Sequence, residues 1–122
     1  MNDPPRLLIV DDDPELRQSA VDALSDAGYE TDVAGNGWEA LAATQGPRVP
    51  QLILLDLMMP DMNGWQFREA QQRDARIKDI PLVVITASRD LVNHPIDADG
   101  VLLKPFGLND LLGQVFKLVG HA

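Results

Sequence analysis

The 122-residue sequence contains no cysteine and no long hydrophobic run, and each absence excludes a class of protein. Without cysteine there is no disulfide framework, no thiolate chemistry and no cysteine-ligated zinc, and a reducing compartment is compatible with the chain. The longest apolar runs, such as Leu52 to Leu55 and Leu82 to Ile85, are far shorter than a membrane span. The first residues, Met-Asn-Asp-Pro-Pro, lack the basic and apolar regions of a signal peptide. We therefore expect a soluble cytoplasmic protein without membrane association.

Basic residues are also scarce, because 10 Lys and Arg stand against 19 Asp and Glu, a formal net charge of −9. A chain with this charge repels nucleic acid at long range, so no direct nucleic-acid binding is expected. Excess acid fits either a solvated acidic surface or a cation site. Only the placement of the acids distinguishes these two interpretations.

The length and a hydrophobic content of 45% fit one compact domain over residues 1–122. Four apolar runs, each too short for a helix, are typical of strands buried on both faces of a parallel sheet. They are Leu7 to Val10, Leu52 to Leu55, Leu82 to Ile85 and Val101 to Leu103. Thr31 to Ala34, with polar residues beside Val33, predicts a fifth strand at a sheet edge.

Between these runs, apolar residues recur with the period of a helix. The groups are Leu16, Ala20, Ala23, Leu24 and Ala27; Trp38, Leu41 and Ala42; Trp65, Phe67 and Ala70; and Leu108, Leu111, Leu112, Val115, Phe116 and Val119. Pro14 suits a first helical turn, and Gly28 suits the position after a helix. Alternating strands and helices predict an α/β fold with a doubly wound parallel sheet, and a ligand crevice at the carboxyl ends of its strands.

Polar residues follow most of the predicted strands, where that crevice lies. Asp11, Asp12 and Asp13 come after Val10, Asp56 after Leu55, Thr86 after Ile85, and Lys104 after Leu103. Taken singly, most have an ordinary interpretation: an aspartate after a strand caps the next helix, as we expect for Asp13. Asp56 is different, since a carboxylate directly after four buried aliphatic residues needs a cation or hydrogen-bond donors beside it.

This set of residues has a definite chemical use. A cluster of carboxylates without His or Cys favours a hard divalent cation, and Mg²⁺, which binds few carboxylates together with phosphate oxygens, fits best. The Asp56 carboxylate would then act as a nucleophile and form an acyl phosphate. Phosphoryl transfer needs in-line positioning and neutralised equatorial oxygens, which Mg²⁺, the Lys104 ammonium and the Thr86 hydroxyl would share.

The sequence resembles the receiver domain of bacterial response regulators, the phosphorylated switches of two-component signalling. The matching segments span most of the chain; they are Leu8 to Asp13, Leu54 to Gly64, Val84 to Ala87 and Leu103 to Phe106. The resemblance implies five helices and five parallel strands in the flavodoxin-like order 2-1-3-4-5. It also implies a histidine kinase or histidine phosphotransfer protein as the phosphoryl donor, and a downstream protein that the sequence does not identify.

By position in these motifs, Asp56 would be the phosphorylation site. Asp11 and Asp12 resemble the acid pair that holds Mg²⁺ together with Asp56, and Met58 would give a backbone carbonyl to the metal. The resemblance implies no enzyme activity beyond the chain's own Mg²⁺-dependent phosphorylation and autodephosphorylation.

Four further residues take their expected roles from the same motifs. Thr86 would donate a hydrogen bond to the phosphoryl group, and Lys104 would form an ion pair with it. The Lys104–Pro105 peptide is expected to be cis, an isomer that proline makes accessible. Gly64 would open the third helix.

Two departures fall where the family usually transmits its signal. Only 17 residues separate Thr86 from Lys104, about one helical turn fewer than usual. The fourth helix is therefore expected to be shortened or lost, and Pro95 disfavours helix there. We expect the segment from Ser88 to Asp99 to be irregular and mobile. The position three before Lys104, usually Tyr or Phe, is Val101, so the usual aromatic partner of the Thr86 switch is absent.

Other interpretations stay open. A haloacid-dehalogenase-like phosphatase also uses an aspartate nucleophile and Mg²⁺, and Asp11 to Asp13 satisfies its Asp-x-Asp pattern, but Glu15 stands where it expects Thr or Val. A receiver that acts only as a docking module is disfavoured by the complete set of site residues and favoured by the altered fourth helix. A stand-alone regulator and a fragment of a larger one are both compatible with the sequence.

Overall fold

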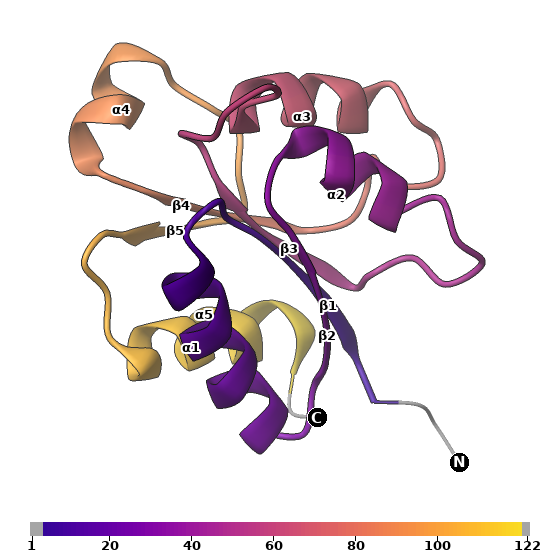
Figure 1. Cartoon of the computed structure of the whole chain (residues 1–122), viewed down its shortest axis with the longest axis vertical. Helices are drawn as coiled ribbons and strands as arrows, with labels where there is room; N and C mark the ends of the chain where they lie inside the picture. Colours follow the sequence, from indigo (N-terminus) through magenta and orange to yellow (C-terminus); the bar gives the residue numbers. More distant parts are fainter. Residues whose placement is uncertain (1–3, 121–122) are drawn as a thin grey trace.

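The computed structural model describes residues 4–120, apart from the side chains at positions 88, 92 and 93. Within this range the chain forms one sheet of five parallel strands in the order β2-β1-β3-β4-β5 (Figure 1). The strands are β1 (Arg6–Val10), β2 (Glu30–Ala34), β3 (Leu52–Asp56), β4 (Leu82–Thr86) and β5 (Gly100–Leu103). The predicted flavodoxin-like strand order is confirmed.

Helices connect the strands and cover both faces of the sheet. They are α1 (Pro14–Asp26), α2 (Gly37–Ala43), α3 (Gly64–Gln72), α4 (Ser88–Asn93) and α5 (Leu108–Val119). α1 and α5 lie on one face, and α2, α3 and α4 lie on the other (Figure 1). The chain therefore has the doubly wound α/β fold that its alternating pattern predicts.

The central strands supply the core because alternate residues of a strand point to opposite faces. In β1, Leu7 and Ile9 pack with α1 and α5, whereas Leu8 and Val10 pack with α2 and α3. Every residue of β3 and β4 is buried as well. The continuous apolar sequence of these strands thus follows from a sheet that is covered on both faces.

The ends of the helices follow signals in the sequence. Asp13 caps α1, because its side chain accepts a hydrogen bond from the N–H of Glu15 at 3.0 Å. Pro14 is the first residue of that helix. Gly28, just after α1, has a φ of 96°, a left-handed conformation that suits glycine. Gly64 opens α3, as expected.

Strand β5 differs from the prediction, which made Val101 to Leu103 a strand buried on both faces. Leu102 is buried, but Val101 is 37% and Leu103 49% exposed. β5 lies at the edge of the sheet, and the short α4 leaves the face with these two side chains uncovered. Trp38 in α2 also lies outside the core, and the buried residues of that helix are Gly37 and Ala40.

The connection between β4 and β5 contains the altered fourth helix. α4 is present but short, with six residues, and the described residues 94–99 belong to no helix or strand. The prediction that the whole segment from Ser88 to Asp99 is irregular is therefore wrong for its first half. Pro95 explains where the helix stops, because it disfavours helical backbone at His94, whose φ of −138° and ψ of 83° are not helical.

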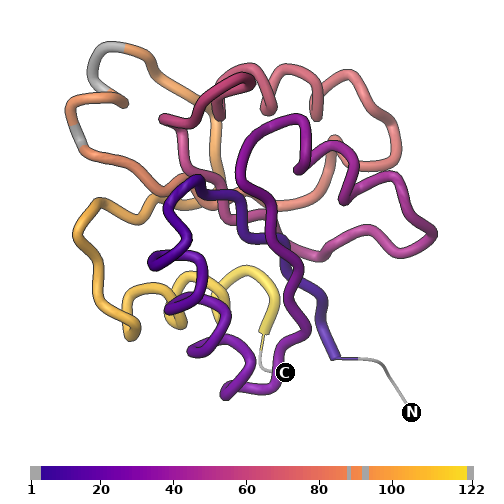
Figure 2. Tube along the Cα trace, viewed as in Figure 1, coloured from indigo at the N-terminus to yellow at the C-terminus, as the bar shows by residue number. Residues whose placement is uncertain are grey.

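The loops that follow β1, β3, β4 and β5 all emerge on the same side of the molecule, at the left of Figures 1 and 2. Parallel strands have their carboxyl ends at one edge of the sheet, so the polar residues after these strands gather there. In the described part of the chain, no helix is both long and apolar enough to cross a membrane.

Candidate functional site

The register of the sheet brings the aspartates after β1 and β3 together. Val10 pairs with Leu55, so Asp11 follows β1 beside Asp56, the last residue of β3. Carboxylate oxygens of Asp11, Asp12 and Asp56 lie within 4.8 Å of one another. The predicted acid cluster is therefore assembled from two neighbouring strands that are far apart in the sequence.

Two of the three acids are buried, and each accepts a backbone hydrogen bond. Asp11 is 0% and Asp56 3% exposed, whereas Asp12 is exposed. Asp11 Oδ1 accepts from the N–H of Asp13 at 2.9 Å, and Asp56 Oδ1 accepts from the N–H of Met58 at 3.2 Å. One such bond does not replace the hydration that a buried carboxylate loses. The site therefore needs positive charge.

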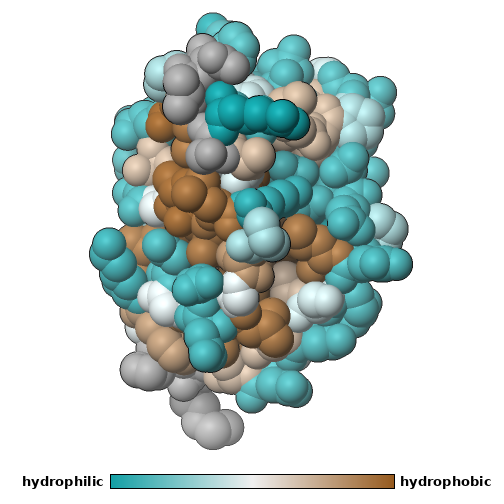
Figure 3. All heavy atoms as spheres, turned by 90° about the vertical axis from the view of Figure 1, so that its left-hand side faces the viewer, coloured by the Kyte–Doolittle hydropathy of each residue, from teal (hydrophilic) through white to brown (hydrophobic). Residues whose placement is uncertain are grey.

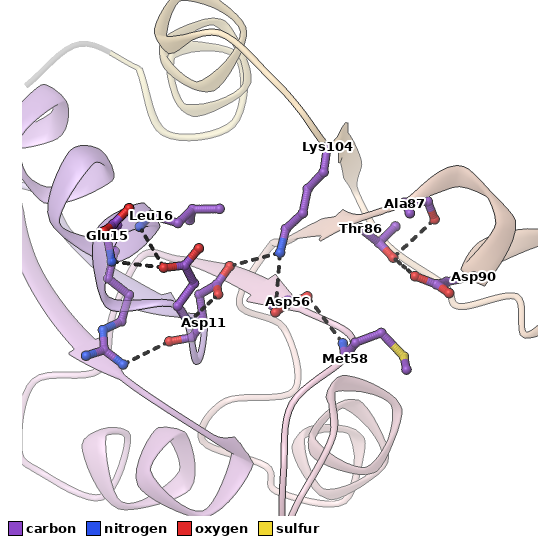
Figure 4. A network of polar contacts seen from close by, with 11 residues as sticks. Asp11, Glu15, Leu16, Asp56, Met58, Thr86, Ala87, Asp90 and Lys104 are labelled. Atoms are coloured by element: carbon purple, nitrogen blue, oxygen red, sulfur yellow. Dashed lines mark hydrogen bonds and ion pairs between the residues drawn. The ribbon is translucent and has the colours of Figure 1, made fainter.

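Lys104, which follows β5, supplies one positive charge. Its Nζ lies 3.5 Å from Asp11 Oδ2 and 3.5 Å from Asp56 Oδ2 (Figure 4). Thr86 pairs with Leu103 in the sheet, which fixes where Lys104 leaves it. A single ammonium thus faces two buried carboxylates, and the cluster retains an excess of negative charge.

This imbalance changes the proton affinity of all three groups. Burial, helped by the charge of Asp11 and opposed by Lys104, raises the pKa of Asp56 from 3.8 to about 7. Burial also raises the pKa of Asp11, although the Asp13 N–H and Lys104 oppose it. Burial lowers the pKa of Lys104, but attraction by Asp56 and Asp11 outweighs this, so its pKa is raised. The lysine stays charged, and the two acids bind a proton more tightly than a free carboxyl does.

The donor atoms of the cluster fit a divalent cation that prefers oxygen ligands. The side chains of Asp11, Asp12 and Asp56 offer only carboxylate oxygens as ligands. Asp11 Oδ2 is buried, and apart from its ion pair with Lys104 at 3.5 Å it accepts no hydrogen bond from the described residues. A cation at this position would coordinate that oxygen. It would also neutralise the negative charge that the single ammonium of Lys104 does not compensate.

Thr86 ends β4 near this cluster, but its hydroxyl is directed elsewhere. It donates to Asp90 Oδ2 at 2.9 Å and lies 3.3 Å from the carbonyl O of Ala87, and it points away from Asp56 (Figure 4). Asp90 belongs to the first turn of α4. Sequence reasoning did not identify Asp90, because the segment from Ser88 to Asp99 is expected from the sequence to be irregular and the contact with Thr86 is visible only in the structure.

Of the remaining predicted residues, Met58 and Pro105 follow the strand ends close to the cluster, whereas Val101 lies within β5. Met58 is exposed and directs its backbone N–H at Asp56, and the Lys104–Pro105 peptide is cis, as expected. Val101 pairs with Val84 in the sheet and carries no ring. Figure 3 shows the face at the strand ends, where apolar groups gather near the middle and hydrophilic groups surround them.

A doubly wound sheet with an acid cluster, a threonine and a lysine at its strand ends is the arrangement of a phosphoryl-accepting receiver. The family model of the response regulator receiver domain matches residues 7–116. The chain therefore belongs to the response regulator receiver domain family of two-component signal transduction. This match removes the phosphatase interpretation that the sequence left open.

Curated relatives carry the same family in their names. The DNA-binding response regulator MtrA of Mycolicibacterium smegmatis is 38% identical over 114 residues, 90% of this chain and 48% of that protein. The response regulator Rre1 of Synechocystis sp. is 35% identical over 126 aligned positions, which cover 99% of this chain and 54% of that protein. The chain thus spans about half the length of the curated relatives it matches.

Solved structures share the fold over nearly the whole chain. The chemotaxis response regulator CheY4 of Vibrio cholerae has a TM-score of 0.86 at 32% identity, with 95% of this chain and 99% of that chain covered. The response regulator TrrA of Thermotoga maritima, solved in complex with Mg²⁺-BeF, has a TM-score of 0.82 at 31% identity, with 94% and 99% covered.

Proposed function

We propose that Asp56 is the phosphorylation site, a nucleophile that takes a phosphoryl group from a histidine kinase or a histidine phosphotransfer protein. The observation that carries this proposal is the position of Asp56, a buried carboxylate 3.5 Å from Lys104 and within 4.8 Å of two further acids. Membership of the receiver family supports it. The chain would be a switch whose phosphorylation state a downstream protein detects.

The proposed reaction is a displacement at phosphorus. An oxygen of ionised Asp56 forms a bond to phosphorus while the bond from phosphorus to the donor nitrogen breaks, which leaves an aspartyl phosphate and a free histidine. A small acyl phosphate reacts in the same way with a carboxylate as leaving group. Water later attacks the same phosphorus while the bond from phosphorus to the Asp56 oxygen breaks, which releases inorganic phosphate and restores the free carboxylate. The chain thus catalyses only its own phosphorylation and dephosphorylation.

We assign Mg²⁺ to the cluster of Asp11, Asp12 and Asp56, with the backbone carbonyl of Met58 as a further ligand. When bound, the ion would neutralise charge on the phosphoryl oxygens and on the cluster. The all-carboxylate donor set and the buried Asp11 Oδ2 support this assignment. So does TrrA, which was solved with Mg²⁺-BeF.

Lys104 and Thr86 are proposed to act on the transferred group. The Lys104 ammonium, 3.5 Å from Asp56 Oδ2, is close enough to pair with a phosphoryl oxygen on that side chain. The Thr86 hydroxyl would donate to another phosphoryl oxygen after it turns from Asp90. Thr86 would therefore act as the switch residue, and Val101 would not follow it as an aromatic ring does.

We propose residues 1–122 as one receiver domain, an extent that the family match over residues 7–116 supports. A cytoplasmic location and the lack of direct nucleic-acid binding stay predictions from composition. The DNA binding named for MtrA belongs to a protein of which the matched region is 48%. It is therefore not transferred to this chain.

Labelling with radioactive acetyl phosphate tests the proposed function. The wild type should take up label only with Mg²⁺, and Asp56→Asn should take up none. Asp61→Asn is a matched control in the loop after β3, because Asp61 is exposed and its φ of 66° is a conformation that Asn tolerates. Uptake by Asp56→Asn at the wild-type rate would show that the assignment is wrong. A pure docking module would take up no label in any variant and would keep its partner binding.

A further inference from the structure

The hydroxyl of Thr86 can donate one hydrogen bond, and in this structure it donates that bond to Asp90. Thr86 Oγ1 is 2.9 Å from Asp90 Oδ2, and the alternative acceptor, the carbonyl O of Ala87, is farther away at 3.3 Å. The Thr86 residue is 1% exposed, so water has little access to compete for this bond. A hydrogen bond to a charged acceptor is about twice as strong as one between neutral groups.

Asp90 is held in place by its own backbone. Its N–H donates to the carbonyl O of Ala87 at 3.1 Å, and its carbonyl O accepts from the N–H of His94 at 2.9 Å. The carbonyl of His94 in turn accepts from Trp65 Nε1 of α3 at 2.8 Å. The acceptor of the Thr86 proton is therefore a fixed part of α4, and α4 is fixed to α3.

α4 needs such an anchor. It has six residues, and its N-cap Ala87 offers no side-chain hydrogen bond. An isolated helix of this length is not stable in water. The bond from Thr86 ties the first turn of α4 to the end of β4.

We infer that Asp90 is a positioning residue that holds the Thr86 hydroxyl away from Asp56 in the unphosphorylated protein and that phosphorylation must compete with it. This inference rests on the proposed function. A phosphoryl group on Asp56 and the Asp90 carboxylate are alternative acceptors for one proton. When the phosphoryl group accepts the Thr86 hydrogen bond, the first turn of α4 keeps the backbone bond from Asp90 to Ala87 but loses the side-chain bond to the end of β4.

The competition gives Thr86 an output that needs no aromatic ring at Val101. A change in the Thr86 hydrogen bond passes directly to α4 through Asp90. From α4 it reaches the contact between His94 and Trp65, whose ring centroids lie 5.6 Å apart. Met58, Asp90, His94 and Trp65 also line one groove. Trp65 can therefore report on the state of α4.

Titration with beryllofluoride in the presence of Mg²⁺ tests the inference, with the full chain in a Trp38→Phe background so that Trp65 is the sole tryptophan. Removal of the competing acceptor in Asp90→Ala should tighten binding about tenfold, which is ~1.4 kcal/mol. Asp97→Ala is the charge-matched control, since Asp97 lies in the same connection with a side chain that is 98% exposed. It should change the affinity less than about twofold.

A double-mutant cycle separates the hydrogen bond from simple charge repulsion. In a Thr86→Ala background, Asp90→Ala should lose its effect, because no hydroxyl remains for which the two acceptors compete. Equal tightening in both backgrounds would overturn the inference and would leave repulsion as the cause. Unchanged or weaker binding by Asp90→Ala alone would overturn it as well. Failure of the wild type to bind beryllofluoride would instead refute the proposed function, and this inference with it.

Discussion

Replacing Asp56 with Asn should stabilise the metal-free protein above neutral pH, although it removes the proposed phosphorylation site. The amide keeps the shape of the side chain and removes its charge. In the wild type, Asp11 and Asp56 are both buried, and the one ammonium of Lys104 is shared between them. The substitution therefore removes a buried charge together with its repulsion of Asp11.

The sign of the pH dependence follows from the direction of the pKa shift. Folding raises the pKa of Asp56 from 3.8 to about 7, so its contribution to stability is complete below pH 3.8 and is lost as the pH rises through about 7. At ~1.4 kcal/mol for each tenfold change in proton affinity, the loss has an upper bound on the order of 4 kcal/mol. Because the pKa of Asp11 is raised too, the two acids share the protons. We expect Asp56→Asn to gain roughly 1–4 kcal/mol near pH 8.

Urea unfolding with a chelator present, repeated at several pH values between about 5 and 8, measures this gain. The difference in unfolding free energy between variant and wild type cancels the groups that both proteins share. That difference should grow with pH for Asp56→Asn and stay constant for Asp61→Asn, which alters an exposed acid of the same loop. Mg²⁺ near pH 8 should stabilise the wild type more than Asp56→Asn. The ion binds the folded state, and the variant lacks one of its three proposed carboxylate ligands.

The result that refutes the reasoning is a variant less stable than the wild type near pH 8 without metal. A gain that does not depend on pH would also refute it, since it would come from packing and not from the carboxylate. Either outcome would mean that Lys104 alone compensates both buried acids.

Three further predictions concern the glycines Gly64 of α3 and Gly113 of α5, the proposed metal ligands, and α4. Gly64→Ala should destabilise the fold by about 1–3 kcal/mol, because a Cβ there would lie 2.7 Å from the backbone at the end of β3. Gly113→Ala, in a helix with nothing within 4 Å of that position, should stabilise it by about 0.5–1 kcal/mol; urea unfolding compares the two. Asp12→Ala should weaken Mg²⁺ binding more than Asp13→Ala, which removes a helix cap, and equal losses in a calorimetric titration would contradict this. Beryllofluoride should change amide hydrogen exchange within residues 88–99. Strong protection in the free protein that stays unchanged when beryllofluoride is added would contradict this prediction.

Most of the fold could be predicted because the central strands carry their signal in every residue. Leu52 to Leu55 and Leu82 to Ile85 are apolar throughout, which only a sheet covered on both faces explains. The same runs place Asp56 and Thr86 at their carboxyl ends. For this reason, parallel topology alone is enough to bring the two residues to one edge of the sheet.

The errors fall where tertiary context outweighs the local pattern. Val101 to Leu103 is as apolar as the other runs, but its burial depends on how much of β5 the neighbouring helix covers, and α4 is too short to cover it. Asp90 was missed because its role comes from an acceptor oxygen 2.9 Å from a hydroxyl in another element. The sequence shows that Thr86 and Asp90 are four residues apart, but it does not specify the contact between their side chains.

Stability and function make opposite demands on Asp56. Burial at 3% exposure raises its pKa and weakens the metal-free fold, so an asparagine would serve the fold better. An exposed aspartate would avoid this penalty, but water would then screen Lys104 and compete for the phosphoryl oxygens. In the buried position, Lys104 and the acid cluster act at short range on a group whose ionised form is both the proposed nucleophile and the destabilised state. A carboxylate at this position is therefore better explained by the proposed phosphoryl transfer than by folding.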